Sequence, residues 1–259
     1  MKNLLFEADG GIGVLTINRP DKLNALDLET INELGEKIEE IEEDNDLRCV
    51  ILRGAGQKAF VAGADISFMQ SLNSVEAYEF SRRGQKLIQA FADSSKVFIA
   101  AVNGYALGGG FEIALGCDFI YASANARFGF PEVTLGILPG FGGTQNLSRI
   151  TGKNIARELI FTGKMIDAEY ARSIGVVNAV LDDVEKLMEY ARKTAEKILS
   201  NGPVGISLAK KAINNGFNLP EDEAYKYEST LFGMVFATED AKEGLKAFVE
   251  KRKPEFKNR

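Results

Sequence analysis

The chain has 259 residues, of which 45% are hydrophobic and 26% charged, and its formal net charge at pH 7 is -6. This composition is typical of a globular protein with a sizeable core and excludes a disordered or fibrous one. The acidic balance disfavours binding to nucleic acid or to an anionic membrane surface, so we expect neither partner. We see no run of about 18 apolar residues and no secretory signal pattern, and therefore expect a cytoplasmic protein.

The histidine count is the strongest constraint, because the chain has none. Ser-His-Asp and Cys-His nucleophiles, histidine metal sites and imidazole proton shuttles are therefore excluded. Cys49 and Cys117 both lie in apolar segments, which favours buried thiols over a disulfide or a zinc site. We expect no metal, so acid-base chemistry must fall to carboxylates, lysines, tyrosines or cysteines.

The first half of the chain alternates between apolar runs typical of strands and amphipathic stretches typical of helices. Strands are predicted at 12–18, 49–54, 97–104 and 118–123, and helices at 27–44, 74–92 and 106–116. After about Leu138 the pattern is mostly helical, with long stretches at 184–200, 204–215 and 220–249. We therefore predict an α/β core domain over 1–195 and a helical oligomerisation region over 196–259.

The segment GAGQKA, Gly54–Ala59, follows a predicted strand and matches the G-x-G-x-x-A form of a dinucleotide-binding fingerprint. The residues after it, FVAGADISFM, contain another glycine and begin no helix at the required place. Neither the phosphate-loop pattern nor the serine-hydrolase elbow occurs. We therefore predict no nucleotide cofactor.

The segment ALGGGFEIALG, Ala106–Gly116, predicts a helix that opens with three glycines, each of which costs about 1 kcal/mol relative to alanine in a helix. Unpaired amides and a positive dipole at a helix start favour a ligand oxygen that gains negative charge. Because helical side chains lean toward the N-terminus, Glu112 should lie over Gly108 and Gly109. This spacing indicates an oxyanion site beside a carboxylate, although a tightly packed glycine helix with an ordinary glutamate fits it equally well.

A second carboxylate, Glu132, lies in FGFPEVTLGILPGFGG, where Pro131 holds Phe130 in an extended conformation. Burial among neighbouring apolar residues would raise its pKa toward that of a general acid, whereas a solvated turn would not. With no imidazole in the chain, a pH dependence between about 5 and 8 would then report Glu112 and Glu132, shielded by Phe111, Phe130 and Leu135. Cys117 is the alternative titrating group.

Five segments together resemble, in order and spacing, the enoyl-CoA hydratase (crotonase) family, and are most similar to its bacterial short-chain members. They are NRPDKLNAL (18–26), KAFVAGADI (58–66), AAVNGYALGGGFEIALGCD (100–118), FGFPEVTLGILPGFGGTQ (128–145) and FVEKRKPEF (248–256). The resemblance implies the α/β crotonase (ClpP-like) fold, a stack of ββα turns with a helical C-terminal trimerisation region. It also implies a homohexamer built as a dimer of trimers.

The resemblance further implies that the backbone N–H groups of Ala64 and Gly109 form an oxyanion hole for a thioester carbonyl. Glu112 and Glu132 would flank one water, Glu112 taking its proton as it attacks C3 and Glu132 delivering a proton to C2. A coenzyme A thioester is the implied substrate, with no other cofactor. The implied contacts to substrate or coenzyme A are Lys22, Leu23, Ala62, Ala64, Asp65, Ile66, Gly109 and Gly140, with Phe248 and Lys251 reaching from a neighbouring subunit.

The sequence departs from the family pattern at Phe111, Phe130 and Asn146, and we expect the two phenylalanines to narrow the acyl pocket. The expected reaction is the reversible hydration of a short trans-2-enoyl-CoA, since both glutamates are present. An enoyl-CoA isomerase of the same family would need Glu132 but not Glu112. A non-catalytic acyl-CoA-binding or RNA-binding member of the fold is the other alternative, and the negative net charge argues against it.

Overall fold

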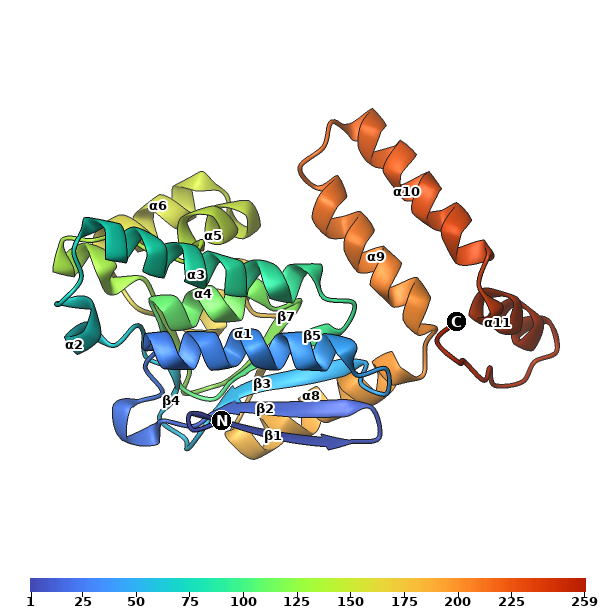
Figure 1. The fold of residues 1–259 in the computed structure, drawn as a ribbon, viewed down its shortest axis with the longest axis horizontal. Helices are drawn as coiled ribbons and strands as arrows, with labels where there is room; N and C mark the ends of the chain where they lie inside the picture. Colours follow the sequence, from blue (N-terminus) through green and yellow to red (C-terminus); the bar gives the residue numbers. More distant parts are fainter.

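The strands form two sheets, one larger and one smaller, in a computed structural model that describes residues 1–259 (Figure 1). The larger sheet contains β1 (Leu4–Asp9), β2 (Ile12–Ile17), β3 (Cys49–Gly54), β5 (Val97–Val102), β7 (Phe119–Ser123) and β10 (Ala179–Leu181), in the order β1-β2-β3-β5-β7-β10. The smaller sheet contains β4 (Ala59–Val61), β6 (Tyr105–Leu107), β8 (Arg127–Gly129) and β9 (Ile166–Asp167), in that order. Only the β1–β2 and β8–β9 pairs are antiparallel.

The chain steps repeatedly from the larger sheet to the smaller one, from β3 to β4, from β5 to β6 and from β7 to β8. Two of these connections between the sheets, β3 to β4 and β5 to β6, require a glycine. A Cβ added at Gly54 would lie 2.3 Å from the carbonyl oxygen of Ala59, and one added at Gly104 would lie 2.2 Å from that of Lys58. Because backbone cannot move aside as a flexible side chain can, these two turns between the sheets require glycine.

Helices cover both faces of the larger sheet. They are α1 (Leu28–Glu43), α2 (Ile66–Met69), α3 (Ser74–Asp93), α4 (Gly109–Gly116), α5 (Gly143–Thr151), α6 (Lys153–Thr162), α7 (Ala168–Ser173), α8 (Val184–Leu199), α9 (Pro203–Gly216), α10 (Glu221–Phe236) and α11 (Glu239–Val249). Helix α8 packs on β3 and β7 from one side, and α1 and α3 lie on the other (Figure 1). Two short 3-10 turns, η1 (Pro20–Lys22) and η2 (Pro131–Leu135), complete the elements. The sheet is therefore buried on both faces, which accounts for its continuous apolar runs.

Local signals in the sequence explain where the main helices begin. The side chain of Asp27 accepts a hydrogen bond from the N–H of Thr30 at the start of α1. Asn73 and Glu76 form a capping box at the start of α3. Such caps satisfy backbone donors that the first helical turn would otherwise leave unpaired, and each is worth about 1 kcal/mol.

Helices α9, α10 and α11 form an arm that projects from the body of the molecule (Figure 1). The Nζ atom of Lys210, on α9, donates to the carbonyl oxygens of Phe91 and Lys96 at 2.7 and 2.8 Å and to Asp118 Oδ2 at 2.9 Å. The predicted division at 195/196 falls inside α8, where Ala195 is buried against the larger sheet. The arm itself begins with α9 at Pro203.

The predicted strands and helices of the first half are confirmed with small changes in their ends, except at the start of the predicted helix 106–116. Ala106 and Leu107 belong to strand β6, and helix α4 begins at Gly109. The predicted helical stretch 220–249 is two helices, because the chain leaves α10 at Ala237 and restarts after the capping side chain of Thr238. The predicted α/β class is confirmed as well. None of the helices is both long and apolar enough to span a membrane.

Candidate active site

A cavity of about 780 Å³ lies between α2, α3, the start of α4 and η2. Glu112 and Glu132 are the only charged side chains in its lining. The other lining residues are apolar or small and polar: Ala62, Gly63, Ala64, Ile66, Met69, Leu72, Ser74, Ala77, Tyr78, Phe80, Ser81, Gly108, Gly109, Pro131, Leu135, Gly136, Ile137, Leu138, Gly140 and Phe141. An apolar cavity with two convergent carboxyl groups is the arrangement expected of an acid-base site.

The glycines that open α4 are required by their neighbours. Gly108 has a φ of +50°, and a Cβ there would lie 2.9 Å from Glu132 Oε1. A Cβ at Gly110 would lie 2.0 Å from the carbonyl oxygen of Val61 on β4. The helix start can therefore approach both η2 and β4 only without side chains, and this close approach brings the two glutamates into one cavity.

Glu112 lies in the first turn of α4 and is 1% exposed. Its Oε1 atom accepts two hydrogen bonds of 2.7 Å, from the backbone N–H groups of Phe141 and Gly143. Burial raises the pKa of Glu112 to about 7, the nearby charge of Glu132 adds to the rise, and the backbone hydrogen bonds oppose it. Glu112 thus has a pKa near neutrality and a set of donors that favours its carboxylate form.

Glu132 lies in η2, and its Oε2 atom is buried with no hydrogen-bond partner. Burial raises the pKa of Glu132 to about 7. The backbone N–H of Glu132 itself opposes this rise, but a carboxylate with one buried oxygen that has no donor is unfavourable, and its protonated form is the less costly one. The two carboxyl groups therefore differ in environment, and Glu132 is the one better suited to carry a proton.

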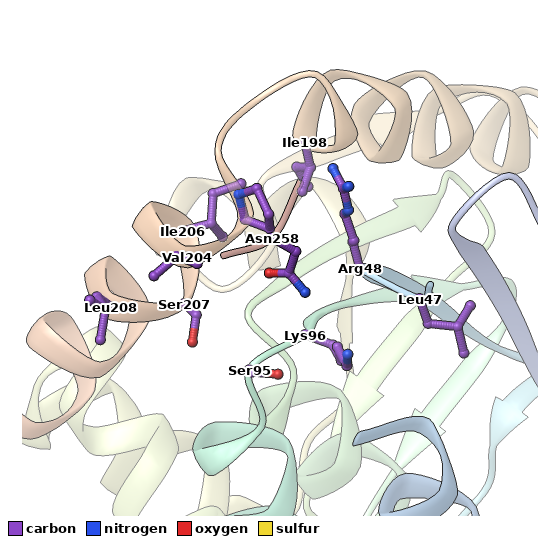
Figure 2. A pocket seen from close by; sticks show the side chains of 11 residues that line it. Leu47, Arg48, Ser95, Lys96, Ile198, Val204, Ile206, Ser207, Leu208 and Asn258 are labelled. Carbon is purple, nitrogen blue, oxygen red and sulfur yellow. The ribbon is translucent and has the colours of Figure 1, made fainter. Parts of the chain in front are cut away.

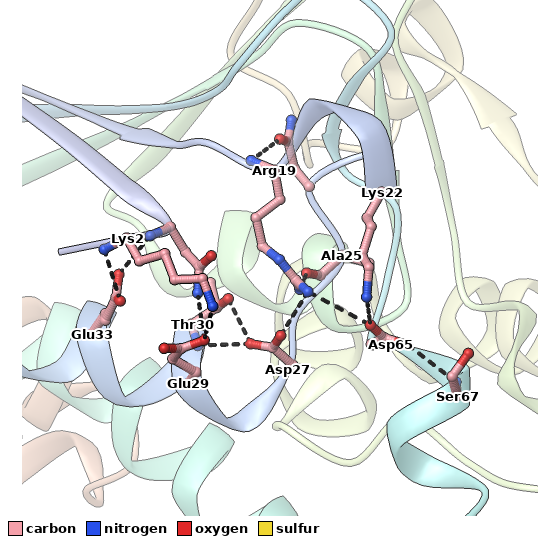
Figure 3. Close-up of polar contacts among 12 residues, drawn as sticks. Lys2, Arg19, Lys22, Ala25, Asp27, Glu29, Thr30, Glu33, Asp65 and Ser67 are labelled. Atoms are coloured by element: carbon pink, nitrogen blue, oxygen red, sulfur yellow. Dashed lines mark hydrogen bonds and ion pairs between the residues drawn. The ribbon is translucent and has the colours of Figure 1, made fainter.

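The backbone around Ala64 is fixed by the segment that precedes α1. Leu26 donates its N–H to the carbonyl oxygen of Gly63 at 2.8 Å and accepts from the N–H of Asp65 at 2.7 Å. Figure 3 shows the Arg19 guanidinium between Asp27 and Asp65, at 2.6 and 3.6 Å. These contacts hold the N–H of Ala64 at the cavity wall.

Two backbone donors in the cavity lining are free. The hydrogen bonds of the chain leave the N–H groups of Ala64 and Gly109 without an acceptor, and both residues line the cavity. Gly109 is the first residue of α4, where the helix leaves such donors unpaired. Each of these donors is thus available to a ligand oxygen in the cavity.

The structure brings most of the predicted site residues together. Those that line the cavity are Ala62, Ala64, Ile66, Gly109, Glu112, Glu132 and Gly140. Lys22, Leu23 and Asp65 stand just outside the lining, where Lys22 Nζ donates to Asp65 Oδ2 at 3.0 Å. Phe248 and Lys251 lie at the end of α11, outside this cavity, and the side chain of Phe248 is 84% exposed.

The expectation that Phe111 and Phe130 narrow the acyl pocket is wrong. Neither side chain lines the cavity; both are fully buried and stack on each other with ring centroids 4.8 Å apart. The Phe130 ring packs against Gly143, whose N–H donates to Glu112, so the aromatic stack supports this hydrogen bond from the side of the core. Leu135, the third predicted shield, does line the cavity but is 56% exposed.

Both cysteines are buried and unpaired, as predicted. Burial raises the pKa of Cys49 to about 12, and it raises that of Cys117 as well. Cys117 Sγ lies 3.5 Å from the carbonyl oxygen of Ile113 and lines a different cavity, between α3, α4 and α9. Cys117 is therefore not part of the site that holds the glutamates.

A smaller cavity of about 140 Å³ lies where α9 begins, and Arg48 and Lys96 are in its lining (Figure 2). Arg48 donates to the carbonyl oxygen of Leu199 at 3.3 Å, and Lys96 donates to that of Asp44 at 2.7 Å. Both cations thus hold backbone segments together. No three His, Cys, Asp or Glu side chains of the chain are grouped so that they could hold a metal ion.

The sequence did not reveal the partners of Glu112. The N–H groups of Phe141 and Gly143 come from the glycine-rich stretch LPGFGG, and no local pattern in the sequence connects this stretch with Glu112. Glycines just before a predicted helix are a signal for exposed backbone donors, and α5 begins at Gly143. The sequence also did not predict the apolar wall that α2 and α3 contribute to the cavity, which includes Met69, Tyr78 and Phe80.

The fold and this site agree with what the chain resembles. A family model described as enoyl-CoA hydratase/isomerase matches residues 7–259, so the chain belongs to that family, and its fold is the crotonase fold. A short-chain-enoyl-CoA hydratase from Clostridium acetobutylicum is 52% identical over 100% of this chain and 99% of its own. A crotonyl-CoA hydratase from Syntrophomonas wolfei is 46% identical over 98% of both chains.

A solved structure gives the same result in three dimensions. The crystal structure of an enoyl-CoA hydratase from Bacillus anthracis superposes with a TM-score of 0.95 at 40% identity, covering 99% of this chain and 100% of that one. With relatives this similar over its whole length, the protein is an enzyme of the hydro-lyase class.

Proposed function

We propose that the protein catalyses the reversible hydration of a short-chain trans-2-enoyl-CoA, such as crotonyl-CoA, to the 3-hydroxyacyl-CoA, and thus acts as a 3-hydroxybutyryl-CoA dehydratase (crotonase). The observation that carries the proposal is the placement of Glu112 and Glu132 in one apolar cavity with the free N–H groups of Ala64 and Gly109. The names of the relatives from Clostridium acetobutylicum and Syntrophomonas wolfei support the same reaction.

In the proposed mechanism the thioester oxygen accepts hydrogen bonds from Ala64 and Gly109. These donors stabilise the negative charge that reaches this oxygen when the nucleophile adds to C3. Glu112, as carboxylate, takes one proton from the attacking water, and the remaining hydroxide forms the new bond to C3. Glu132, as the acid, gives its proton to C2, and the reverse steps dehydrate the product.

The environments of the two glutamates support this division of roles. Two backbone donors at 2.7 Å favour the carboxylate of Glu112, as a general base requires. Glu132 has a buried oxygen with no donor, which favours the protonated form that a general acid requires. Burial raises the pKa of both carboxyl groups, and the charge of one disfavours ionisation of the other, which favours one shared proton on the pair near neutral pH.

We place the acyl chain against the apolar wall of the cavity and the coenzyme A along the segment from η1 to the start of α2. The contacts of this second part would be Lys22, Leu23, Ala62, Asp65 and Ile66. Ala62 and Ile66 line the cavity, and the ammonium group of Lys22 pairs with Asp65 next to them in the chain. We propose no metal and no redox cofactor, with coenzyme A entering only as part of the substrate.

The proposal is tested by mixing crotonyl-CoA with the pure enzyme and following the loss of the ultraviolet absorbance of the enoyl thioester. Glu112→Gln and Glu132→Gln are each expected to lower kcat at least about 100-fold, because each removes a positioned acid or base. The double variant is expected to lose far less than the product of the two factors, because both groups act in one step. Glu79→Gln, an exposed glutamate of α3 with no side-chain partner, is the control.

A near-parental kcat in either single variant would contradict the mechanism. An enzyme that leaves crotonyl-CoA unchanged but moves the double bond of a 3-enoyl-CoA would be an isomerase instead. An enzyme that binds the thioester without converting it would be a non-catalytic member of the fold.

We also propose that the enzyme assembles as a trimer or hexamer through its C-terminal arm. Apolar side chains of the arm are exposed in the single chain, among them Phe232, Phe236, Phe248 and Val249. An exposed set of this size is typical of an interface. Light scattering is expected to give a trimer or hexamer, and deletion from Ala247 onward is expected to weaken both assembly and coenzyme A binding, with Phe248 and Lys251 lost. A fully active monomer would refute this proposal.

A further inference from the structure

One peptide group connects helix α3 with Glu112. The carbonyl oxygen of Gly140 accepts hydrogen bonds from Ser81 Oγ at 2.6 Å and from Gln85 Nε2 at 3.1 Å. The N–H of the same peptide belongs to Phe141 and donates to Glu112 Oε1 at 2.7 Å. Because a peptide group is planar, the hydrogen bonds that orient its carbonyl also fix the direction of its N–H.

The support on α3 is rigid. The ring of Phe141 lies on the backbone of α3 at Gly84, where an added Cβ would come within 2.1 Å of the ring. The same ring packs edge-on against Phe80, with centroids 5.1 Å apart. Ser81 and Gln85 are one turn apart on this surface and reach the same oxygen. Both sides of the Gly140–Phe141 peptide are therefore held by α3.

We propose that Ser81 and Gln85 are positioning residues for Glu112 and act on it through the Gly140–Phe141 peptide. Donation to the carbonyl polarises the peptide and strengthens its N–H as a donor. The carboxylate of Glu112 is then held in place and stabilised by groups it does not touch. The catalytic consequence rests on the proposed function, in which Glu112 is the base, whereas the effect on its ionisation does not.

The surroundings of Glu112 leave few other causes for a change in its ionisation. The elements packed against α4 include α3, α5, β4, β6 and β7. Glu132, from η2, is the only charged group among the causes of the shifted pKa and the only other charged side chain in the cavity lining. Ser81→Ala removes no charge and releases none, so a change in the pKa of Glu112 in that variant would report the hydrogen bond through the peptide. Gln85→Leu also releases the guanidinium of Arg82, which donates to Gln85 Oε1 at 2.6 Å, so it is interpreted together with Ser81→Ala.

The first test is a titration that requires no activity. Protein labelled with carbon-13 at the glutamate carboxyl is titrated by NMR, and the Glu112 signal is assigned with Glu112→Gln. Ser81→Ala and Gln85→Leu are each expected to raise the pKa of Glu112, and the double variant by about 0.5 or more, because the charged form loses part of its hydrogen bonding. Gln89→Leu is the matched control, since Gln89 lies one turn further along α3 and donates only to Asp93.

The second test is kinetic. Ser81→Ala and Gln85→Leu are expected to lower kcat for crotonyl-CoA hydration about 10-fold, with KM changed less than about 2-fold, and to move the acid limb of the pH profile upward. Ser81→Thr keeps the hydroxyl and is expected to restore most of kcat. In a Glu112→Gln background Ser81→Ala is expected to cost less than about 2-fold, because the group it positions is already gone.

The two proposals fail in different ways. Absence of hydration by the parent enzyme, or a parental rate for Glu112→Gln, would remove the proposed function and leave the titration to decide the role of Ser81 and Gln85. A pKa of Glu112 that is the same in parent, Ser81→Ala and Gln85→Leu would overturn the positioning role. An effect of Gln89→Leu as large as that of Gln85→Leu would overturn it too, because any damage to α3 would then suffice.

Discussion

Replacing the buried Glu112 by glutamine is expected to stabilise the folded enzyme at alkaline pH while it destroys activity. Glutamine keeps an oxygen that can accept the hydrogen bonds from Phe141 and Gly143, which both go to Oε1. The change therefore removes the cost of a buried charge and little else. This cost exists because burial raises the pKa of Glu112 to about 7 from an ordinary value of 4.5.

The sign follows from proton linkage. A carboxyl whose pKa is higher in the folded state has its full stability below the unfolded pKa of 4.5 and loses it as the pH rises toward 7. The difference in pKa corresponds to about 3 kcal/mol in the free energy of unfolding. Glu112→Gln cannot ionise, so its advantage over the parent is expected to be about 3 kcal/mol larger at pH 8.5 than at pH 4.5.

Urea denaturation of parent and variant at these two pH values, followed by circular dichroism, measures the difference. Glu79→Gln is the control, because this exposed side chain of α3 has no hydrogen-bond partner, and it is expected to change the free energy by less than about 0.5 kcal/mol at either pH. If Glu112→Gln gives the same advantage at both pH values, or none at either, then the charge of Glu112 is not what burial penalises and the reasoning is refuted.

Three further variants test other parts of the structure. Lys210→Met removes the cation beside Asp118, which keeps only the N–H of Phe98, and leaves two carbonyl oxygens unpaired. It is expected to lower the free energy of unfolding by about 3 kcal/mol, and a loss below about 1 kcal/mol in urea denaturation would contradict this. Arg19→Gln loosens the segment that holds Ala64 and is expected to lower kcat/KM about 10-fold; parental kinetics with subsaturating crotonyl-CoA would show that its ion pairs are dispensable. Cys117→Ala is expected to leave the pH profile of kcat/KM unchanged, and loss of a limb near neutral pH would reassign it to the thiol.

The sequence was sufficient for those parts of the site that depend on local geometry. The lean of helical side chains placed Glu112 beside Gly108 and Gly109, and all three line one cavity. The apolar neighbours of Glu132 left a buried carboxyl and a solvated turn as alternatives, and the structure favours the first, because Oε2 is buried and burial raises the pKa of Glu132. Both interpretations need only residues within one turn or one short loop of each other.

The errors and omissions come from contacts between distant segments. Phe111 is next to Glu112 in sequence, but neighbouring residues on a helix point about 100° apart, so its ring enters the core instead of the cavity. The donors to Glu112 lie 29 and 31 residues further along the chain, and no pattern near Glu112 reveals them. Strands β4, β6 and β8 have three residues each, too few for a period of two to be recognised.

One side of the cavity, with Glu112, is buried in the core, and the opposite side is exposed to solvent. This difference decides which residues can be exchanged without a loss of stability. Glu112 belongs to the core, so a substitution beside it disturbs folding and chemistry at once. Leu135, Ile137 and Leu138 form the outer wall and are 56%, 41% and 66% exposed, so exchanging them costs little folding free energy. With the acyl chain placed against this wall, as proposed above, substitutions at these three positions are expected to change acyl-chain preference without altering the two glutamates.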